Sequence, residues 1–239
     1  MWKHRIGSAD MTRRILPAHS VGTGRRGPLD RAARALQWFL DRRRRTDGLL
    51  QSANTWEAQY ASGRWDYLGQ LPELARFSVL AGYICHLKPG GAVLDIGCGQ
   101  GTLLRRLPDS AYSSYVGIDV SPSAIATAQE RQPKNSTFVA ADCEVYVPAG
   151  NFDVLVFNEV LCCLREPLHT VEGYARSLNP GGLLLVSLCT AAHGSATVLW
   201  QLKRAFALVD EVRISHVGRN VSWVCAALRA PEAGPATGI

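Results

Sequence analysis

The chain has 239 residues, 47% of them hydrophobic, and a formal net charge of +6. That length predicts one domain with an extension, and it is enough to bury a large core. No apolar run reaches the ~18 residues that a membrane-spanning helix needs, and the N-terminus lacks the apolar segment of a signal peptide. The seven cysteines are scattered without a C-x-x-C pair, which favours reduced thiols in a cytoplasmic protein over a disulfide framework.

The positive charge belongs to the N-terminal arm. Residues 1–48 hold twelve Lys and Arg against four Asp, whereas the rest of the chain holds fourteen Lys and Arg against sixteen Asp and Glu. Within the arm, an amphipathic helical pattern begins at Pro28 and ends in the basic stretch 42–45 before Gly48. Three interpretations of this helix stay open: a packing or lid helix, a contact with an anionic surface or membrane, and an RNA-binding arm. The near-neutral remainder argues against a nucleic-acid groove within the fold itself.

Within the segment 49–90, residues 52–87 predict two further helices before the first strand. An aromatic group marks this segment: Trp56, Tyr60, Trp65 and Tyr67. Two interpretations apply to it, and both can hold together. The aromatic face packs over the edge of a sheet, or it forms a lid over a bound ligand, where aromatic rings stabilise a cation.

The segment 93–102 carries the most specific motif of the chain. An apolar run ends in Asp95, and glycines follow at Gly97, Gly99 and Gly101. This pattern predicts a buried strand, a tight turn and the start of a helix, the geometry in which a backbone approaches a nucleotide-like ligand closely. The spacing fits neither the dinucleotide fingerprint nor the phosphate-binding loop, which places Lys and then Ser or Thr after its last glycine.

Polar residues follow the next three predicted strands, which span 115–118, 137–141 and 152–157: Asp119, then Asp142 and Cys143, then Asn158 and Glu159. Asp119 lies 24 residues after the aspartate of the glycine motif. An acidic side chain at about that distance is placed to accept hydrogen bonds from both ribose hydroxyls. Ser121 and Pro122 then predict the start of a helix, as N-cap and first helical residue.

The rest of the chain completes an alternating pattern. A Pro-Gly-Gly turn at 180–182 precedes a fifth strand, and a helix is expected over 194–206. Two strands follow over 208–217 and 221–230, with a hairpin turn between them.

In this order the landmarks resemble those of the class I S-adenosylmethionine-dependent methyltransferases, over roughly residues 50–229. The resemblance implies a Rossmann-like α/β fold, with a seven-stranded mixed sheet of order 3-2-1-4-5-7-6, an antiparallel last strand and helices on both faces. It also implies four parts: the basic arm 1–48, a helical lid 49–90, the cofactor-binding domain 91–230 and a flexible tail 231–239.

The resemblance further implies S-adenosyl-L-methionine as cofactor and S-adenosyl-L-homocysteine as product. In this family an N-terminal helix covers the methionine end of the cofactor, and the acidic residue after the third strand receives the adenine amino group. The cofactor-binding residues expected on this basis are Tyr60, Asp95, Gly97, Cys98, Gly99, Asp119, Val120, Asp142, Cys143 and Asn158.

The segment 158–164 resembles the acceptor side of methyltransferases similar to the nodulation N-methyltransferases, which act on chitooligosaccharides. Here Cys162 and Cys163 replace the two tyrosines of that segment. Glu159 is a candidate base or acceptor-orienting group, with a helix-capping carboxylate as the alternative. His193 is a second candidate base, with a solvent-exposed helix residue as the alternative. No His, Cys and acid cluster has the spacing of a metal site.

We therefore expect a methyltransferase that acts by in-line displacement on an O or N atom of a small or medium acceptor, such as a sugar, a glycan or a secondary metabolite. The first alternative is an RNA or protein methyltransferase that docks through the arm, the only route by which nucleic acid is expected as a partner. The second is a cofactor-binding protein without transferase activity.

Overall fold

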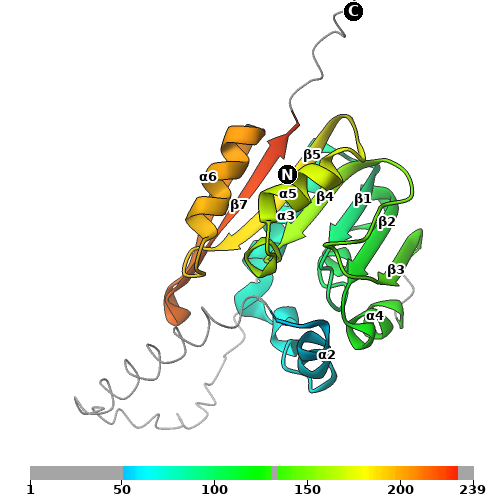
Figure 1. Cartoon of the computed structure of the whole chain (residues 1–239), viewed down its shortest axis with the longest axis vertical. Coiled ribbons are helices and arrows are strands. Elements are labelled where there is room, and N and C mark those ends of the chain that lie inside the picture. Colours follow the sequence, from blue (N-terminus) through cyan, green and yellow to red (C-terminus); the bar gives the residue numbers. More distant parts are fainter. Residues whose placement is uncertain (1–50, 131–133, 231–239) are drawn as a thin grey trace, which may run out of the picture. The chain divides into compact units, whose positions relative to one another are not determined.

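The computed structural model describes residues 51–130 and 134–230 (Figure 1). The predicted arm, the helix expected to begin at Pro28 and the tail 231–239 lie outside these residues. At the centre is a seven-stranded sheet of order β3-β2-β1-β4-β5-β7-β6. Its strands are β1 (Gly91–Ile96), β2 (Tyr112–Asp119), β3 (Ser136–Ala140), β4 (Phe152–Asn158), β5 (Leu178–Cys189), β6 (Ala207–His216) and β7 (Val221–Arg229). β7 pairs antiparallel with β5 and with β6, and the other four pairings in this sheet are parallel, so the predicted fold and strand order are confirmed.

Both faces of the sheet are buried, which explains why its central strands are apolar throughout. In β4, Val154 and Val156 face one side and Leu155 and Phe157 face the other, and all four are fully buried. Successive side chains of a strand point to opposite faces, so a strand covered on both sides has no polar face to show.

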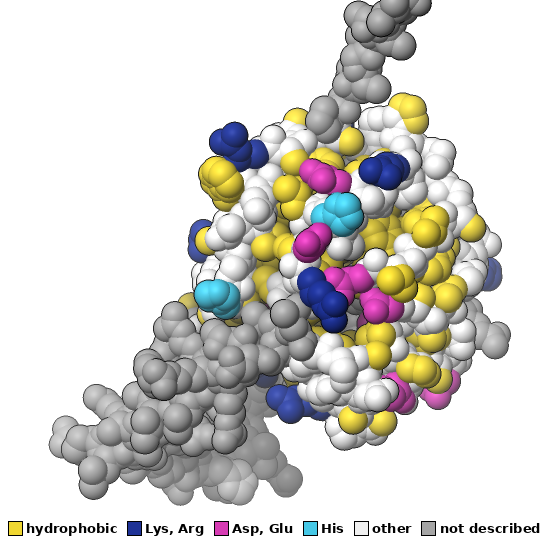
Figure 2. Space-filling model, viewed as in Figure 1, with side chains coloured by type: hydrophobic (Ala, Val, Ile, Leu, Met, Phe, Trp, Pro, Cys, Tyr) yellow, Lys and Arg dark blue, Asp and Glu magenta, His cyan; other side chains and the backbone are white. Residues whose placement is uncertain are grey.

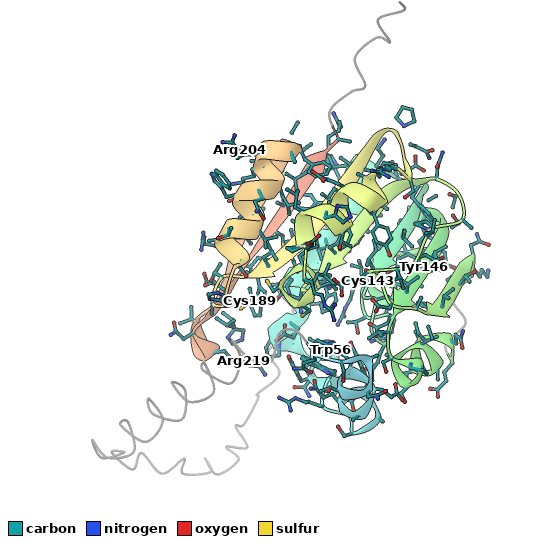
Figure 3. The ribbon with its side chains drawn as sticks, in the orientation of Figure 1. Trp56, Cys143, Tyr146, Cys189, Arg204 and Arg219 are labelled. Carbon is teal, nitrogen blue, oxygen red and sulfur yellow. The ribbon has the colours of Figure 1, made fainter. Side chains whose placement is uncertain are left out.

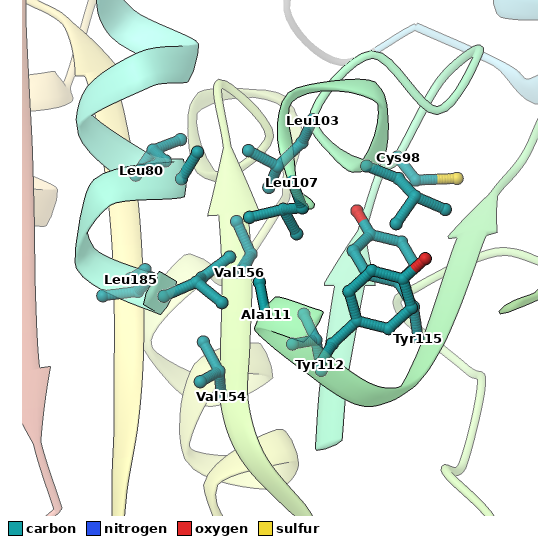
Figure 4. Close-up of a cluster of buried hydrophobic side chains, with 14 of the residues drawn as sticks. Leu80, Cys98, Leu103, Leu107, Ala111, Tyr112, Tyr115, Val154, Val156 and Leu185 are labelled. Carbon is teal, nitrogen blue, oxygen red and sulfur yellow. The ribbon is translucent and has the colours of Figure 1, made fainter. Parts of the chain in front are cut away.

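Each face is covered by its own helices (Figure 1). The helix α3 (Leu71–Leu87) covers one face, and α5 (Pro167–Ala175) and α6 (Ser195–Ala205) cover the other. Figure 4 shows this core: Leu80 of α3 lies at one side of the cluster and the paired rings of Tyr112 and Tyr115 at the other, with Leu107 and Val156 between them. The two-sided core holds the carboxyl ends of the parallel strands at one edge, where ligands bind in such folds.

Helices begin and end where local signals predict. The side chain of Ser121 accepts the N–H of Ala124 at 3.1 Å and caps α4 (Pro122–Gln129), as expected from the sequence. Proline also stands in the first turn of α3 and of α5, where its missing N–H costs nothing. Two α-helices precede β1, as predicted: α2 (Ala53–Ala61) and α3. The 3₁₀ turn η1 (Asp66–Gly69) lies between them.

The prediction of a helix directly after the glycine turn is wrong. Between β1 and β2 the chain forms only two 3₁₀ turns, η2 (Leu104–Arg106) and η3 (Asp109–Ala111). Gly101 has a φ of +69°, and Pro108 follows closely. A left-handed residue at one end and a proline at the other leave less than two helical turns between them, too few for a stable α-helix.

Short 3₁₀ turns also follow β4 and join the last two strands: η4 (Leu161–Cys163) and η5 (Val217–Arg219). On the face drawn in Figure 2, acidic and basic side chains are intermixed among apolar ones, without a field of one sign. Across the ranges 51–130 and 134–230, no helix is both long and apolar enough to cross a membrane.

Candidate functional site

The glycine turn after β1 lies beneath α2. Gly97 and Gly99 have φ values of +72° and +53°, which a residue with a side chain adopts only at a cost. A Cβ on Gly99 would lie 2.7 Å from the Oη of Tyr60, and a Cβ on Gly97 would overlap Val160. The turn is therefore a bare backbone cradle between α2 and the loop after β4.

Asp95 lies at the end of β1 with 1% of its surface exposed. One carboxylate oxygen accepts the hydroxyl of Tyr115, whereas Oδ1 is buried and has no partner within the described residues. Burial raises the pKa of Asp95 to about 7, and the hydrogen bond from Tyr115 opposes that rise. A buried acceptor without a donor costs about 1–3 kcal/mol, which an ammonium group of a bound ligand would offset.

Asp119 joins the glycine turn to the start of α4. Its Oδ2 accepts the N–H of Gly99 at 2.8 Å, and its Oδ1 accepts the N–H of Ser121 at 3.0 Å. Burial raises the pKa of Asp119, and these backbone hydrogen bonds lower it. Each carboxylate oxygen has a second lone pair, so this side chain can still accept two hydroxyl groups at once.

Glu57 of α2 is a member of this site that the sequence did not reveal. Its carboxylate accepts the hydroxyls of Ser121 and Ser123, and it accepts the N–H of Ser123 at 3.1 Å. The hydrogen bond from Ser121 is the main reason why the pKa of Glu57 is lowered. Because the N-terminus of α4 attracts negative charge, this contact fixes α2 beside Asp119. A lone exposed-looking glutamate in a helical pattern gives no signal for such a role.

The aromatic group predicted over 49–90 comes together in the structure. The ring of Trp65 lies 5.7 Å from that of Trp56, 6.2 Å from that of Tyr60 and 5.9 Å from that of Tyr67. Burial raises the pKa of Tyr60 well above its ordinary value, so the phenol stays neutral over the glycine turn. This placement suits both interpretations of the group, packing and lid.

The loop after β3 lies next to Asp119, because the N–H of Ala141 donates to the Asp119 carbonyl at 2.8 Å. Asp142 is exposed, and its Oδ1 accepts the N–H of Glu144 at 2.9 Å. Cys143 is partly buried, and burial raises its pKa to about 12, so its thiol is uncharged at neutral pH. Val120, directly after Asp119, is also partly buried.

Asn158 and Glu159 stand at the carboxyl end of β4. Asn158 Oδ1 accepts the hydroxyl of Ser187 at 2.7 Å, and the N–H of Glu159 donates to the Ser187 carbonyl at 3.1 Å. Glu159 has a φ of +64°, a left-handed conformation that is rare outside glycine and asparagine and often marks a functional position. Burial raises the pKa of Glu159, and the charge of Arg76 lowers it.

The structure does not bring His193 into this group. His193 is exposed in the turn between β5 and α6, and among residues 51–130 and 134–230 it has no recorded hydrogen bond or ion pair. Cys162 turns toward α6, where its Sγ lies 3.0 Å from the Oγ of Ser195. Burial raises the pKa of Cys163 to about 12, and all seven cysteines are free. The thiols that replace the two tyrosines are therefore neutral.

These side chains gather at one end of the sheet. In Figure 3, Trp56 of α2, Cys189 at the end of β5 and Arg219 of η5 lie toward the end to which the parallel strands point, whereas Arg204 lies at the other.

Within the described ranges, no cluster of three His, Cys, Asp or Glu side chains could hold a metal ion. The orphaned oxygen of Asp95, the bare glycine cradle and the remaining acceptors of Asp119 fit S-adenosylmethionine, which carries an ammonium, a cationic sulfur and two ribose hydroxyls.

Comparison with known proteins agrees with this geometry. A family model described as a methyltransferase domain matches residues 67–223. Ribosomal protein L11 methyltransferase of Burkholderia ambifaria is 31% identical over 142 residues, which are 59% of this chain and 44% of that relative. The match thus spans less than half the length of that protein.

Two solved structures share the fold. N-methyltransferase NodS of Bradyrhizobium japonicum WM9, in complex with S-adenosyl-L-homocysteine, superposes with a TM-score of 0.62 at 23% identity over 70% of this chain and 92% of that one. Magnesium protoporphyrin IX methyltransferase of Synechocystis PCC 6803, with bound S-adenosylmethionine, gives 0.61 at 20% identity over 76% and 98%. Their bound cofactors are the two that the family resemblance implies for this chain. Together with the family model, the fold shows that this chain belongs to the class I S-adenosylmethionine-dependent methyltransferases.

Proposed function

We propose that this protein transfers a methyl group from S-adenosylmethionine to an O or N atom of a small or medium acceptor, such as a sugar, a glycan or a secondary metabolite. The cofactor supplies a methyl group already activated by its sulfonium. What the chain must add is alignment of the acceptor atom with that methyl group and exclusion of water. The observation that carries the proposal is the left-handed Glu159 after Asn158 at the end of β4, beside the loop that closes over Gly97.

On the cofactor side we assign roles by position. Asp119 would accept the ribose hydroxyls, Asp95 would face the methionine ammonium, and the backbone of Gly97 and Gly99 would lie against the methionine part of the cofactor. The other proposed cofactor contacts are Tyr60, Cys98, Val120, Asp142, Cys143 and Asn158. Tyr60 and Glu57, both on α2, would close the site from the N-terminal side.

On the acceptor side we assign Glu159 as the base or orienting group. Its carboxylate is partly buried at the strand end, and burial raises its pKa toward the range in which a base works near neutral pH. His193 is the alternative base, exposed in the turn after β5. Once an acceptor is known, Glu159→Gln should lower turnover about 100-fold or more with little change in cofactor affinity, whereas His193→Ala should do so only if the histidine is the base.

The near-neutral charge of residues 49–239 and the short cap formed by α2 and η1 favour a small acceptor over a polyanion. The test is transfer of a labelled methyl group from S-adenosylmethionine to a panel of acceptors, with chitooligosaccharides and small hydroxyl and amine compounds first. Label on a small acceptor would support the proposal. Label only on protein or RNA would contradict it.

The likeness to a ribosomal protein L11 methyltransferase supports a second candidate, a protein or RNA methyltransferase that docks through the basic arm. Replacing the four arginines at 42–45 with glutamine in the full chain tests it. If the arm docks the substrate, the variant should lose affinity for that substrate and also lose the steep salt dependence of binding.

A further inference from the structure

A buried guanidinium from α3 reaches the end of β4. Arg76 is 3% exposed, its Nη1 donates to Asn158 Oδ1, and its Nη2 donates to Glu73 Oε2 at 3.1 Å. Its Nε is buried and has no partner in the described part of the chain. A charge buried with an unmet donor costs stability, so packing alone does not explain why an arginine stands here.

Glu73 holds this guanidinium in place. While Oε2 of Glu73 accepts Arg76, its Oε1 accepts Nη1 of Arg219 at 3.1 Å. Glu73 is 4% exposed, and both of its oxygens are engaged. Arg219 comes from η5, the tip of the hairpin between β6 and β7, so the ion pairs fix Arg76 from two elements.

Arg76 also decides the orientation of the Asn158 amide. Asn158 Oδ1 accepts both Arg76 and the hydroxyl of Ser187, which occupies both lone pairs of that oxygen. If the amide were turned over, its NH₂ group would face the guanidinium of Arg76, which has only donors. The hydroxyl of Ser187 can also donate to Glu159 Oε1, at 3.1 Å, so Arg76 is the partner that fixes the amide, and the NH₂ group points away from Arg76.

The carboxylate of Glu159, the residue after Asn158, lies beside the same contact, since the hydroxyl of Ser187 is 2.7 Å from Asn158 Oδ1 and 3.1 Å from Glu159 Oε1. Arg76 therefore acts on this carboxylate as well. Within the described residues, the titratable groups that act on Glu159 come from three elements: Arg76 and Glu73 of α3, Cys162 and Cys163 of η4, and Cys225 of β7. The thiols are neutral at ordinary pH, so Arg76 provides the positive charge in this set. Burial raises the pKa of Glu159, and Arg76 opposes that rise.

We propose that Arg76 is a positioning residue of the methyl-transfer site: it turns the NH₂ end of Asn158 toward the proposed cofactor and supplies the counter-charge of Glu159. The first part rests on the proposed function, because it takes Asn158 as a cofactor contact. The second part concerns the folded chain alone, so the two can be tested separately.

The first experiment is calorimetric titration of the full chain with S-adenosylhomocysteine, in the wild type, Arg76→Met, Asn158→Ala and the double variant. If Arg76 acts through Asn158, each single change should weaken binding several-fold, and the double variant should bind as the Asn158→Ala variant does. This part would be overturned if the affinity losses of the two single variants multiplied in the double variant. It would also be overturned if the folded Arg76→Met variant bound S-adenosylhomocysteine with wild-type affinity.

The second experiment measures thermal stability against pH without cofactor. A carboxyl whose folded pKa is raised stabilises less as pH rises from its ordinary pKa through the folded value. Loss of Arg76 should raise the pKa of Glu159 further, so Arg76→Met should lose more stability at pH 8 than at pH 5. Each further unit of pKa lowers the folding equilibrium constant about tenfold above the folded value.

Glu159→Gln is the matched background. In it, the extra loss of stability that Arg76→Met causes at pH 8 should be smaller than in the wild-type background, and only the part due to Glu73, which also loses a partner, should remain. An equally pH-dependent loss in both backgrounds would overturn the role of Arg76 as counter-charge of Glu159. Arg76→Lys separates the two roles if the methionine variant does not fold. It keeps the charge and should keep the wild-type pH dependence, but it lacks the planar fork and should weaken cofactor binding. Failure of the wild type to bind S-adenosylhomocysteine would refute the proposed function. The thermal-stability measurements on the Arg76 and Glu159 variants would then still test whether Arg76 is the counter-charge of Glu159.

Discussion

Replacing Asp119 with alanine should weaken binding of S-adenosylhomocysteine by about 1–3 kcal/mol, which is roughly 5- to 150-fold. The range follows from the geometry of the carboxylate. Its two oxygens accept the N–H groups of Gly99 and Ser121 at 2.8 and 3.0 Å, which holds the carboxylate where the ribose hydroxyls would bind. The alanine variant loses the ligand contacts and leaves two backbone donors at the glycine turn and the start of α4 without their acceptor.

Asp153→Ala is the matched control for this prediction. Asp153 is also a strand carboxylate that accepts a backbone N–H, from Ala92 at 2.8 Å, and it accepts Asn179 at 3.0 Å. It lies near the amino end of β4, away from the site. Calorimetry should show lost affinity for Asp119→Ala and none for Asp153→Ala, while both variants lose thermal stability. Equal affinity in the two variants would refute the assignment of the ribose to Asp119.

Three further outcomes follow from the same site. Gly99→Val should abolish cofactor binding, because its Cβ would lie 2.7 Å from the Oη of Tyr60 at a φ of +53°; Gly82→Val, with nothing within 4 Å of the added carbon, should bind normally in the same calorimetric assay. Glu57→Ala should weaken cofactor binding several-fold, because α2 loses its tie to the start of α4; native affinity would show that α2 does not cover the ligand. Burial raises the pKa of Asp95 to about 7, so the stability it contributes falls as pH rises from about 4 to 7. Asp95→Asn should remove this dependence from thermal melts at pH 5 and pH 8, and a parallel shift at both values would contradict the raised pKa.

The parts of the fold that the sequence predicted correctly depend on local signals or on the period of the strands. Ser121 and Pro122 place the start of α4 because an N-cap needs only its own helix. The order of the strands followed from five landmarks in register with a known family. The helix expected after the glycine turn failed because Gly101 and Pro108 together leave too little room, and the apolar pattern between them does not show this.

The acceptor side was only partly predictable. Glu159 stood out because it follows a strand end, but its left-handed backbone and its link to Ser187 arise from the packing of β4 against β5. Arg76 looked like one charged residue in an amphipathic helix, and its partner Asn158 lies 82 residues away. Contacts at that separation leave no periodicity in a single sequence, so only the folded chain reveals them.

The most direct test of the central claim is calorimetric titration of the purified full chain with S-adenosylmethionine and S-adenosylhomocysteine. The glycine cradle, the orphaned oxygen of Asp95 and the free acceptors of Asp119 predict binding of both ligands at micromolar concentration. Absence of binding to either ligand would contradict the account at its root, because the proposed role of Glu159 in transfer and the action of Arg76 through Asn158 both depend on a methyl donor at this site.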